Sequence, residues 1–307
     1  MEVLSNNLQV LFQGLALGSI YALVALGFVL IIRATNVVNF AQGDFAMLGG
    51  YAMVLFTVGI PGNPDLHIPG IGIHLPYWLA IVLAAGVMAV IGIAFNFGVY
   101  YPLRNRQFLP VLISTLGASI FLQNTVLAVF NPQPRPLDKL IHSEGITVGG
   151  VFLDSQYLVI LGFTILAVAF QYFFFEHTLI GKKLQATSQD KDMARLLGIP
   201  VSLMIIITFI YSAVLGGLAG VLVGPILFVS IGMGSTIALK AFAATIIGGF
   251  GDVAGAIVGG LIIGVIESFA AYYISVPYKD AYAFLALFLV LLLRPQGIFG
   301  EKVSEKA

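Results

Sequence analysis

The sequence contains no cysteine, which excludes disulfide bonds, thiolate metal ligands and cysteine nucleophiles. Charge is also scarce: only 9% of the 307 residues are Asp, Glu, Lys or Arg, whereas an average soluble domain carries about 25%. Basic and acidic residues number 14 each, so the chain has no surplus of positive charge for binding nucleic acid. These shortages exclude a soluble enzyme and a nucleic-acid-binding protein.

Catalytic motifs are missing as well. The sequence holds no phosphate-binding G-x-x-x-x-G-K-[ST] pattern and no H-E-x-x-H pattern, and its four histidines form no metal-ligand spacing. Residues 249–254 fit the dinucleotide-binding pattern G-x-G-x-x-A, but another apolar span follows them where that pattern requires a strand–helix unit. We therefore predict that the chain is not an enzyme and binds neither a metal nor a cofactor of its own.

Long stretches without charge dominate what is present. They cover residues 3–32, 66–103, 107–134, 155–175 and 196–239. A membrane-spanning helix needs about 20 apolar residues to cross a hydrocarbon core about 30 Å thick. Because backbone amides in lipid must be hydrogen-bonded within their own segment, continuous apolar runs favour helices over a barrel of alternating strands. The sequence predicts an all-α, polytopic membrane helical bundle.

Nine segments are predicted to lie in the membrane: 10–32, 38–58, 77–100, 108–130, 156–175, 202–224, 236–250, 253–275 and 280–293. The segment 236–250 contains Lys240, and 280–293 is short, so one of them is either re-entrant or tilted. We thus expect eight or nine membrane segments with discontinuous or re-entrant helices, forming one domain over residues 1–307.

Basic residues set the expected orientation, because short cytoplasmic loops are enriched in Lys and Arg. Arg33, Arg104, Arg106 and the loop from residue 177 to 200 mark one side as cytoplasmic. The segments 59–76 and 131–154 and the N-terminus are then predicted to lie outside, which makes this a multi-pass membrane protein.

Glycines recur at intervals of four residues in three places: 14 and 18; 216, 220 and 224; 251, 255 and 259. This spacing puts small residues on one face of a helix, where two backbones can approach closely. We interpret these glycines as helix-packing positions.

Four charged residues fall within or beside the apolar segments: Asp44, Lys240, Asp252 and Glu267. Each costs at least about 2.5–3.5 kcal/mol at the centre of a bilayer, so they must be structural pairs, loop residues or substrate contacts. The polar stretches 39–44 and 248–252 interrupt their segments, and such breaks either bind small polar solutes or simply turn the chain. As candidates for a translocation path we take Asn39, Gln42, Asp44, Lys240, Asp252 and Glu267.

The two interruptions resemble each other. Residues 43–46 read Gly-Asp-Phe-Ala and lead to a Gly-Gly pair, and residues 251–254 read Gly-Asp-Val-Ala and also lead to a Gly-Gly pair. Duplicated halves with matching discontinuities are common in transporters. The match indicates a weak internal repeat.

The cytoplasmic loop is predicted to contain a short amphipathic helix that begins near Ser188 and stops at residues 198–200. Met193, Leu196 and Leu197 would share one face of it. Such a helix is either an interfacial anchor or a docking element for a partner; an anchor would be more basic and more apolar, so docking is favoured.

Part of this loop resembles a known motif. Residues 192–194 (Asp-Met-Ala), followed after three residues by Gly198, are similar to the E-A-A-x-x-x-G loop through which permease subunits of ABC importers contact their ATPases. The match departs from the motif at its first two positions. The resemblance assigns ATPase coupling to Asp192, Met193, Ala194, Leu197 and Gly198.

The resemblance extends along most of the chain. Segments 14–23, 39–44, 240–244, 248–249 and 255–267 are similar to LivH-type permeases of high-affinity branched-chain amino acid ABC importers. This implies a location in the bacterial cytoplasmic (inner) membrane. It also implies partners: a second, homologous permease, two cytosolic ATPases that hold ATP and magnesium, an extracytoplasmic substrate-binding protein, and membrane lipid. Relatives of this type import leucine, isoleucine and valine, but also other amino acids, amides and urea.

One alternative remains open from the residues themselves. A stand-alone secondary transporter or channel for small polar solutes could use Asp44, Lys240, Asp252 and Glu267 for ion coupling. The predicted docking helix argues against it, because a free-standing carrier needs no such element.

Overall fold

The computed structural model describes residues 2–59, 73–141, 145–148 and 150–300, and within them the chain is nearly all helical. The helices are α1 (Glu2–Thr35), α2 (Gln42–Thr57), α3 (Tyr77–Phe95), α4 (Phe108–Phe130), α5 (Ser155–His177), α6 (Leu179–Gln189), α7 (Lys191–Leu196), α8 (Val201–Leu227), α9 (Met233–Gly248), α10 (Val253–Tyr273) and α11 (Lys279–Leu293). A π-helical turn (Asn96–Tyr100) and a 3-10 turn (Tyr101–Leu103) extend α3. The strands β1 (Ile146–Val148) and β2 (Val151–Leu153) form a small antiparallel hairpin. The predicted all-α bundle is confirmed.

The helices that correspond to the nine predicted segments fall into two groups by length. Six helices in the described residues are long and apolar enough to cross a membrane: α1, α3 with its extension, α4, α5, α8 and α10. The other three are shorter, with 16 residues in α2, 16 in α9 and 15 in α11. At 1.5 Å per residue, 16 residues span only about 24 Å, less than the hydrocarbon core. Three helices are therefore shorter than a membrane span, whereas the sequence predicted this for only one of the segments 236–250 and 280–293, which correspond to α9 and α11.

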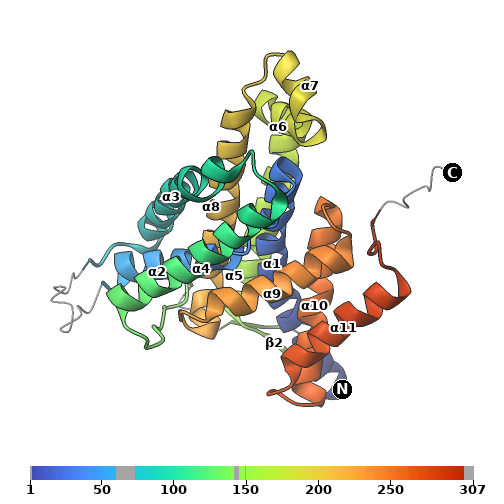
Figure 1. Ribbon diagram of the computed structural model, residues 1–307. Helices are drawn as coiled ribbons and strands as arrows, with labels where there is room; N and C mark the ends of the chain where they lie inside the picture. Colours follow the sequence, from blue (N-terminus) through green and yellow to red (C-terminus); the bar gives the residue numbers. More distant parts are fainter. Residues whose placement is uncertain (1, 60–72, 142–144, 149, 301–307) are drawn as a thin grey trace.

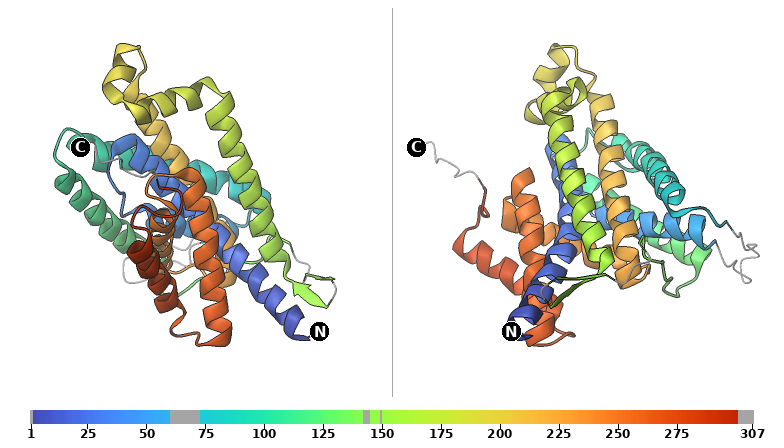
Figure 2. Two further views of the ribbon diagram at one scale, coloured as in Figure 1. Left: turned by 90° about the vertical axis from the view of Figure 1, so that its right-hand side faces the viewer. Right: turned by 180° about the vertical axis from the view of Figure 1, so that it is seen from behind.

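Two of the short helices, α2 and α9, lie across the long helices α1, α8 and α10. In Figure 1, α1, α8 and α10 run up the picture, whereas α2 and α9 cross it, and α2 is buried along most of its length. The paired helices α6 and α7 project from one end of the bundle, and the N-terminus and the hairpin lie at the other (Figure 2). We call these the α6/α7 end and the hairpin end.

The order of elements repeats within the chain. Each of the long helices α1 and α8 is followed by a non-glycine residue of positive φ, Asn36 (61°) and Phe228 (57°), and then by a helix of 16 residues. The second residues of those helices, Gly43 and Gly234, lie against each other: a Cβ atom added to Gly43 would be 2.1 Å from the carbonyl oxygen of Gly234. Since α1 runs toward the α6/α7 end and α8 runs away from it, the two units are inverted (Figure 1).

The order of a long helix, a turn and a short helix thus occurs twice, and residues 43–46 and 251–254, which were predicted to correspond, do not occupy the same place in it. Asp252 caps the N-terminus of α10, whereas the structural counterpart of the break before α2 is the break before α9. In a glycine-rich chain, the short Gly-Asp match occurs without structural equivalence.

Close helix packing occurs at the spaced glycines other than Gly251. The prediction for Gly251 is wrong, because this residue lies in the turn before α10 with a φ of +90°, and nothing lies within 4 Å of a Cβ atom added there. A Cβ on Gly18 of α1 would be 2.7 Å from the Cα of Leu261 in α10, and one on Gly220 of α8 would be 1.8 Å from the carbonyl oxygen of Ala46 in α2. Such contacts leave no space for a methyl group, so these helix pairs depend on glycine.

Candidate functional site

A buried lysine and a buried glutamate meet inside the bundle. Lys240 lies in the middle of α9 and Glu267 in the last third of α10, and they are 3% and 2% exposed. The Lys240 Nζ atom lies 2.7 Å from Glu267 Oε1 and donates a hydrogen bond to it. The structure therefore brings together two of the predicted path residues, which are 27 positions apart in the sequence.

Three further side chains complete this ion cluster. The Tyr21 hydroxyl of α1 donates to Glu267 Oε2 over 2.7 Å. At the start of α11, Asp280 Oδ1 lies 2.8 Å from Lys240 Nζ, and Lys279 Nζ lies 3.2 Å from Glu267 Oε1. Two positive and two negative charges thus balance, which makes the burial of Lys240 and Glu267 tolerable in the membrane. The cluster ties α11 to α1, α9 and α10.

A cavity of about 300 Å³ lies beside the ion cluster. Its polar wall includes Lys240, Glu267, Lys279 and Asp280, and its apolar wall consists of Leu17, Leu227, Met233 and Ile237. A cavity with both charge signs at one side and aliphatic side chains at the other is complementary to a zwitterion with an apolar side chain.

Asp44 lies apart from the ion cluster, in the first turn of α2. It is 2% exposed, and its Oδ1 atom accepts a hydrogen bond of 2.9 Å from Gln123 Nε2 of α4. Ser119 also hydrogen-bonds to this carboxylate, and Gln123 in turn donates to the exposed Ser235 of α9 over 3.3 Å. Within the described residues no cation pairs with Asp44, so its charge is supported only by neutral donors.

Asn39 and Gln42 are buried near Asp44. Gln42 is fully buried, and its amide binds Ser212 of α8, with Oε1 2.8 Å from the Ser212 hydroxyl oxygen. Asn39 Oδ1 accepts from the backbone of Ala41 over 3.1 Å and shapes the turn into α2. Both residues hold the start of α2 in place, next to Asp44.

Asp252 belongs to a different region, at the α6/α7 end. Its Oδ1 atom accepts a hydrogen bond of 2.6 Å from the backbone nitrogen of Gly255 and so caps α10. Its other oxygen lies 4.0 Å from Arg33 Nη2 at the end of α1. The structure does not bring Asp252 together with Lys240 and Glu267.

The predicted docking helix is α7, but it begins later than expected. Ser188 lies inside α6, where its hydroxyl donates back to the carbonyl of Gln185 over 2.8 Å. The N-cap is Asp190, whose Oδ1 atom accepts from the backbone nitrogens of Asp192 and Met193, each at 2.9 Å. A carboxylate caps a helix at least as well as a hydroxyl, so the break between α6 and α7 falls at Asp190.

One face of α7 is apolar and exposed. Met193, Leu196 and Leu197 have exposed fractions of 54%, 82% and 72%. Ala194 points the other way and is buried among the side chains that join α7 to the bundle, including Phe95 and Val201. Leu196, which the motif comparison does not include, is the most exposed of the three, and its spacing from Met193 identifies it.

Charge and chain geometry define the rest of α7. Asp192 is exposed and pairs with Arg195 over 2.8 Å, one turn along the helix. Partial burial lowers the pKa of Lys191, and repulsion from Arg195 adds to this effect, while Asp192 opposes it. Gly198 has a φ of +76°, which other residues adopt only with strain, and it ends the helix before Pro200 leads into α8.

Sequence reasoning did not identify Tyr21, Gln123, Lys279 and Asp280. The two charged residues stand at a helix start, where charge needs no special explanation, and only the folding of α11 against α9 and α10 brings them to Lys240. Tyr21 lies in an apolar run without any polar neighbour. A search for partners of the membrane charges would have pointed to Lys279 and Asp280, the nearest uncommitted charges in the sequence.

Comparisons with known proteins agree with this architecture. Residues 10–293 match the family described as branched-chain amino acid transport system, permease component. The high-affinity branched-chain amino acid transport system permease protein LivH of Escherichia coli strain K12 is 35% identical, with 97% of each chain covered. The permease protein BraD of Pseudomonas aeruginosa is 33% identical over the full length of both chains.

A more distant relative is the probable branched-chain amino acid transport permease protein LivH of Methanocaldococcus jannaschii, which is 28% identical over 92% of this chain and 89% of its own. No solved structure matches the chain. With six helices able to cross a membrane and a family match over nearly its whole length, the chain is a multi-pass membrane protein and belongs to the permease-component family of branched-chain amino acid transport systems.

Proposed function

We propose that this chain is the membrane permease of an ATP-driven importer that moves branched-chain or related amino acids into the cell. The observation that carries the proposal is α7, a helix that presents Met193, Leu196 and Leu197 to solvent while the buried Ala194 fixes it to the bundle. An exposed apolar face on a rigid element is suited to a hydrophobic groove on a partner. The relatives, which are named permease proteins of transport systems, support the same conclusion.

The partners follow from this role. Two cytosolic ATPases, which hold ATP and magnesium, would engage α7 from the cytoplasmic side, and an extracytoplasmic binding protein would deliver the solute at the hairpin end. A second permease would cover exposed helices of this chain. The exposed apolar residues of α4, such as Ile113, Ile120 and Phe121, suit either that partner or lipid.

The path would use the ion cluster and Asp44. In the cavity beside Lys240 and Asp280, the carboxylate and ammonium groups of an amino acid can replace the Lys240–Asp280 pair charge for charge, so the transfer leaves no buried charge alone. Asp44 offers a second acceptor for an ammonium group. Asn39 and Gln42 would position Asp44, and Asp252 would act outside the path by fixing the start of α10.

Coupling would run through α8. This helix begins three residues after Gly198 and packs against α1, α2 and α3. A displacement of α7 by the ATPases therefore moves α8, and α8 carries Ser212, which holds Gln42 at the start of α2. Motion of the docking helix would thus reach the residues around Asp44.

The Leu196→Asp variant tests the docking claim. Because the side chain is 82% exposed, the change leaves the fold intact but puts a charge into the apolar contact, so we expect loss of ATPase copurification and of uptake. The control is Ile141→Asp, the same kind of change at an exposed residue of the hairpin end, and it is compared by ATPase copurification alone, because the binding protein would dock at that end. ATPase recovery at the wild-type level with Leu196→Asp would contradict the proposal, as would uptake by the purified chain alone in liposomes, which would favour a secondary transporter or channel.

A further inference from the structure

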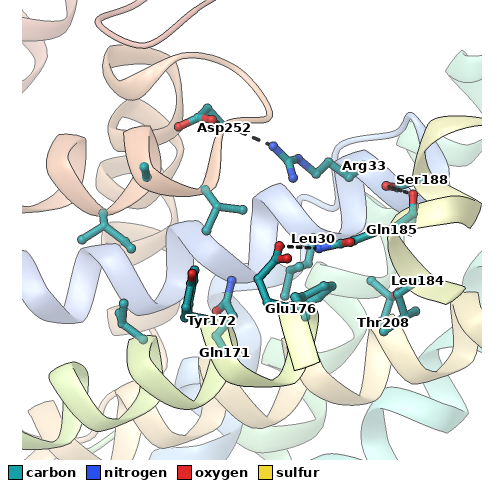
Figure 3. Close-up of a pocket in the computed structure, with 16 residues that line it drawn as sticks. Leu30, Arg33, Gln171, Tyr172, Glu176, Leu184, Gln185, Ser188, Thr208 and Asp252 are labelled. Carbon is teal, nitrogen blue, oxygen red and sulfur yellow. Dashed lines mark hydrogen bonds and ion pairs between the residues drawn. The ribbon is translucent and has the colours of Figure 1, made fainter. Parts of the chain in front are cut away.

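One cavity lies away from the proposed path, under α6. Its volume is about 390 Å³, within the range of about 300–1,000 Å³ typical of small-molecule sites. Residues of α1, α5, α6, α8 and α10 line it, and Figure 3 shows Arg33 and Asp252 on one side, opposite Gln171 and Glu176 of α5. We call it the α6 pocket.

An unpaired amide belongs to a residue in the wall of this pocket. Gln171 is 3% exposed, and neither its Nε2 nor its Oε1 atom has a hydrogen-bond partner in the described structure. Leaving a buried polar group without a partner is unfavourable by about 1–3 kcal/mol. One donor and one acceptor at the same place therefore call for a ligand that offers both.

The mouth of the pocket adds charge of both signs. Arg33 donates through Nε to the carbonyl of Gly251 over 2.5 Å, and its Nη2 atom is only loosely paired with Asp252 at 4.0 Å. Glu176 already accepts from Lys182 and Gln185, at 2.6 and 3.0 Å. Arg33 is thus the cation available to an incoming carboxylate, and Asp252 the nearby anion for an ammonium group.

Besides the hydroxyl-bearing Tyr172 and Thr208, the wall has an apolar part. It consists of Leu30, Val168, Phe175, Val253 and Ile257. Water could bind the Gln171 amide, but water gains nothing from aliphatic and aromatic walls. The arrangement fits a small solute with an ammonium group, a carboxylate and an aliphatic side chain.

We propose that the α6 pocket binds an apolar amino acid from the cytoplasmic side and that its occupancy slows the transporter. The pocket roof is α6, through Leu184, Gln185 and Ser188, and α7 follows α6 after the single residue Asp190. A ligand that joins α6 to α1, α5 and α10 restrains the element that the ATPases move. The imported product would thereby limit further import.

The choice of leucine as the ligand rests on the proposed function, whereas the pocket itself is inferred from the residues that line it. The experiment uses the permease–ATPase complex in lipid nanodiscs, which expose both faces. Binding protein saturated with leucine stimulates ATP hydrolysis, and leucine is then raised to millimolar levels; binding of radiolabelled leucine to the complex without binding protein is measured in parallel.

We expect wild-type hydrolysis to fall as leucine rises. Gln171→Leu and Arg33→Gln should shift the inhibition and binding curves to about tenfold higher leucine, the loss expected for one good hydrogen bond, without changing hydrolysis at low leucine. Gln171→Leu removes an unpaired polar group and should fold. Gln107→Leu, the same change at an exposed residue outside the pocket, should behave as wild type.

Three outcomes would overturn the inference: no inhibition or binding in the wild type, unchanged curves in both pocket variants, or a phospholipid that stays in the pocket and is not displaced by leucine. Uptake measured in proteoliposomes distinguishes failure of the pocket proposal from failure of the proposed function. If leucine is taken up but does not inhibit ATP hydrolysis, only the pocket proposal is contradicted. If leucine is not taken up but binds saturably and in a way that depends on Gln171, only the proposed function is contradicted.

Discussion

Replacing Lys240 with methionine should reveal how strongly the ion cluster holds the bundle together. The change keeps the length of the side chain but leaves Glu267, which is 2% exposed, without its closest cation. Breaking a buried ion pair from one side costs about 3–5 kcal/mol. Because Tyr21 still donates to Glu267 and Lys279 Nζ is 3.2 Å away, we expect the lower end, about 3 kcal/mol.

The double variant Lys240→Met/Glu267→Leu supplies the matched comparison. With both charges gone, no buried carboxylate is stranded, and Asp280 and Lys279 are exposed enough to be solvated, so we expect the free energy of unfolding to return to within about 1 kcal/mol of wild type. Unfolding is measured by denaturant titration in mixed micelles for the wild type, both single variants and the double variant. If the free energy of unfolding lost in the double variant equals the sum of the losses in the two single variants, the reasoning is refuted, because interacting residues must deviate from additivity.

The same double variant distinguishes a role in stability from a role in transport. If the ion cluster lies on the path, uptake by the reassembled complex is lost although the fold is stable. Normal uptake would show that the cluster only stabilises the structure. Asp44→Asn keeps the size of the side chain but removes the charge, and we expect leucine uptake to fall by at least about tenfold. The control is Asp138→Asn, the same change at an exposed residue. Equal uptake by the two variants would show that Asp44 is not part of the path. Gly49→Ala places a Cβ atom 2.1 Å from the carbonyl oxygen of Gly217 and should lower the free energy of unfolding by about 1–3 kcal/mol. Gly86→Ala, where nothing lies within 4 Å, should raise it by about 0.5–1 kcal/mol, and similar values for the two glycine variants would contradict the packing described for α2 and α8.

Much of the fold was accessible from the sequence, for a physical reason. Lipid excludes both charge and unpaired backbone groups, so charge-free runs mark the spans; the predicted segment 108–130 coincides with α4, and 156–175 differs from α5 by two residues or fewer at each end. The break between α6 and α7 was misplaced because Ser188 and Asp190 can both cap a helix, and only the backbone hydrogen bonds decide between them.

The candidate site was accessible only in part. The energetic cost of charge in a membrane identifies Lys240 and Glu267 wherever they lie. Their partners depend on how α11 folds back, and no local pattern encodes that long-range contact. For the same reason, sequence could group Asp252 with Asp44 by their Gly-Asp neighbours, although one caps α10 and the other lies inside the bundle near α4.

The contact between Gly43 and Gly234 has a mechanical consequence. The two short helices meet at their first turns with no space for a single methyl group, and each is joined by a tight turn to one of the long helices α1 and α8. Neither helix can slide toward the other, so relative motion there is limited to rotation about the contact or to separation. A displacement of α7 that is carried along α8 would therefore make the two short helices rotate about this contact. A small displacement at the cytoplasmic end would then become a larger rotation of the inverted unit.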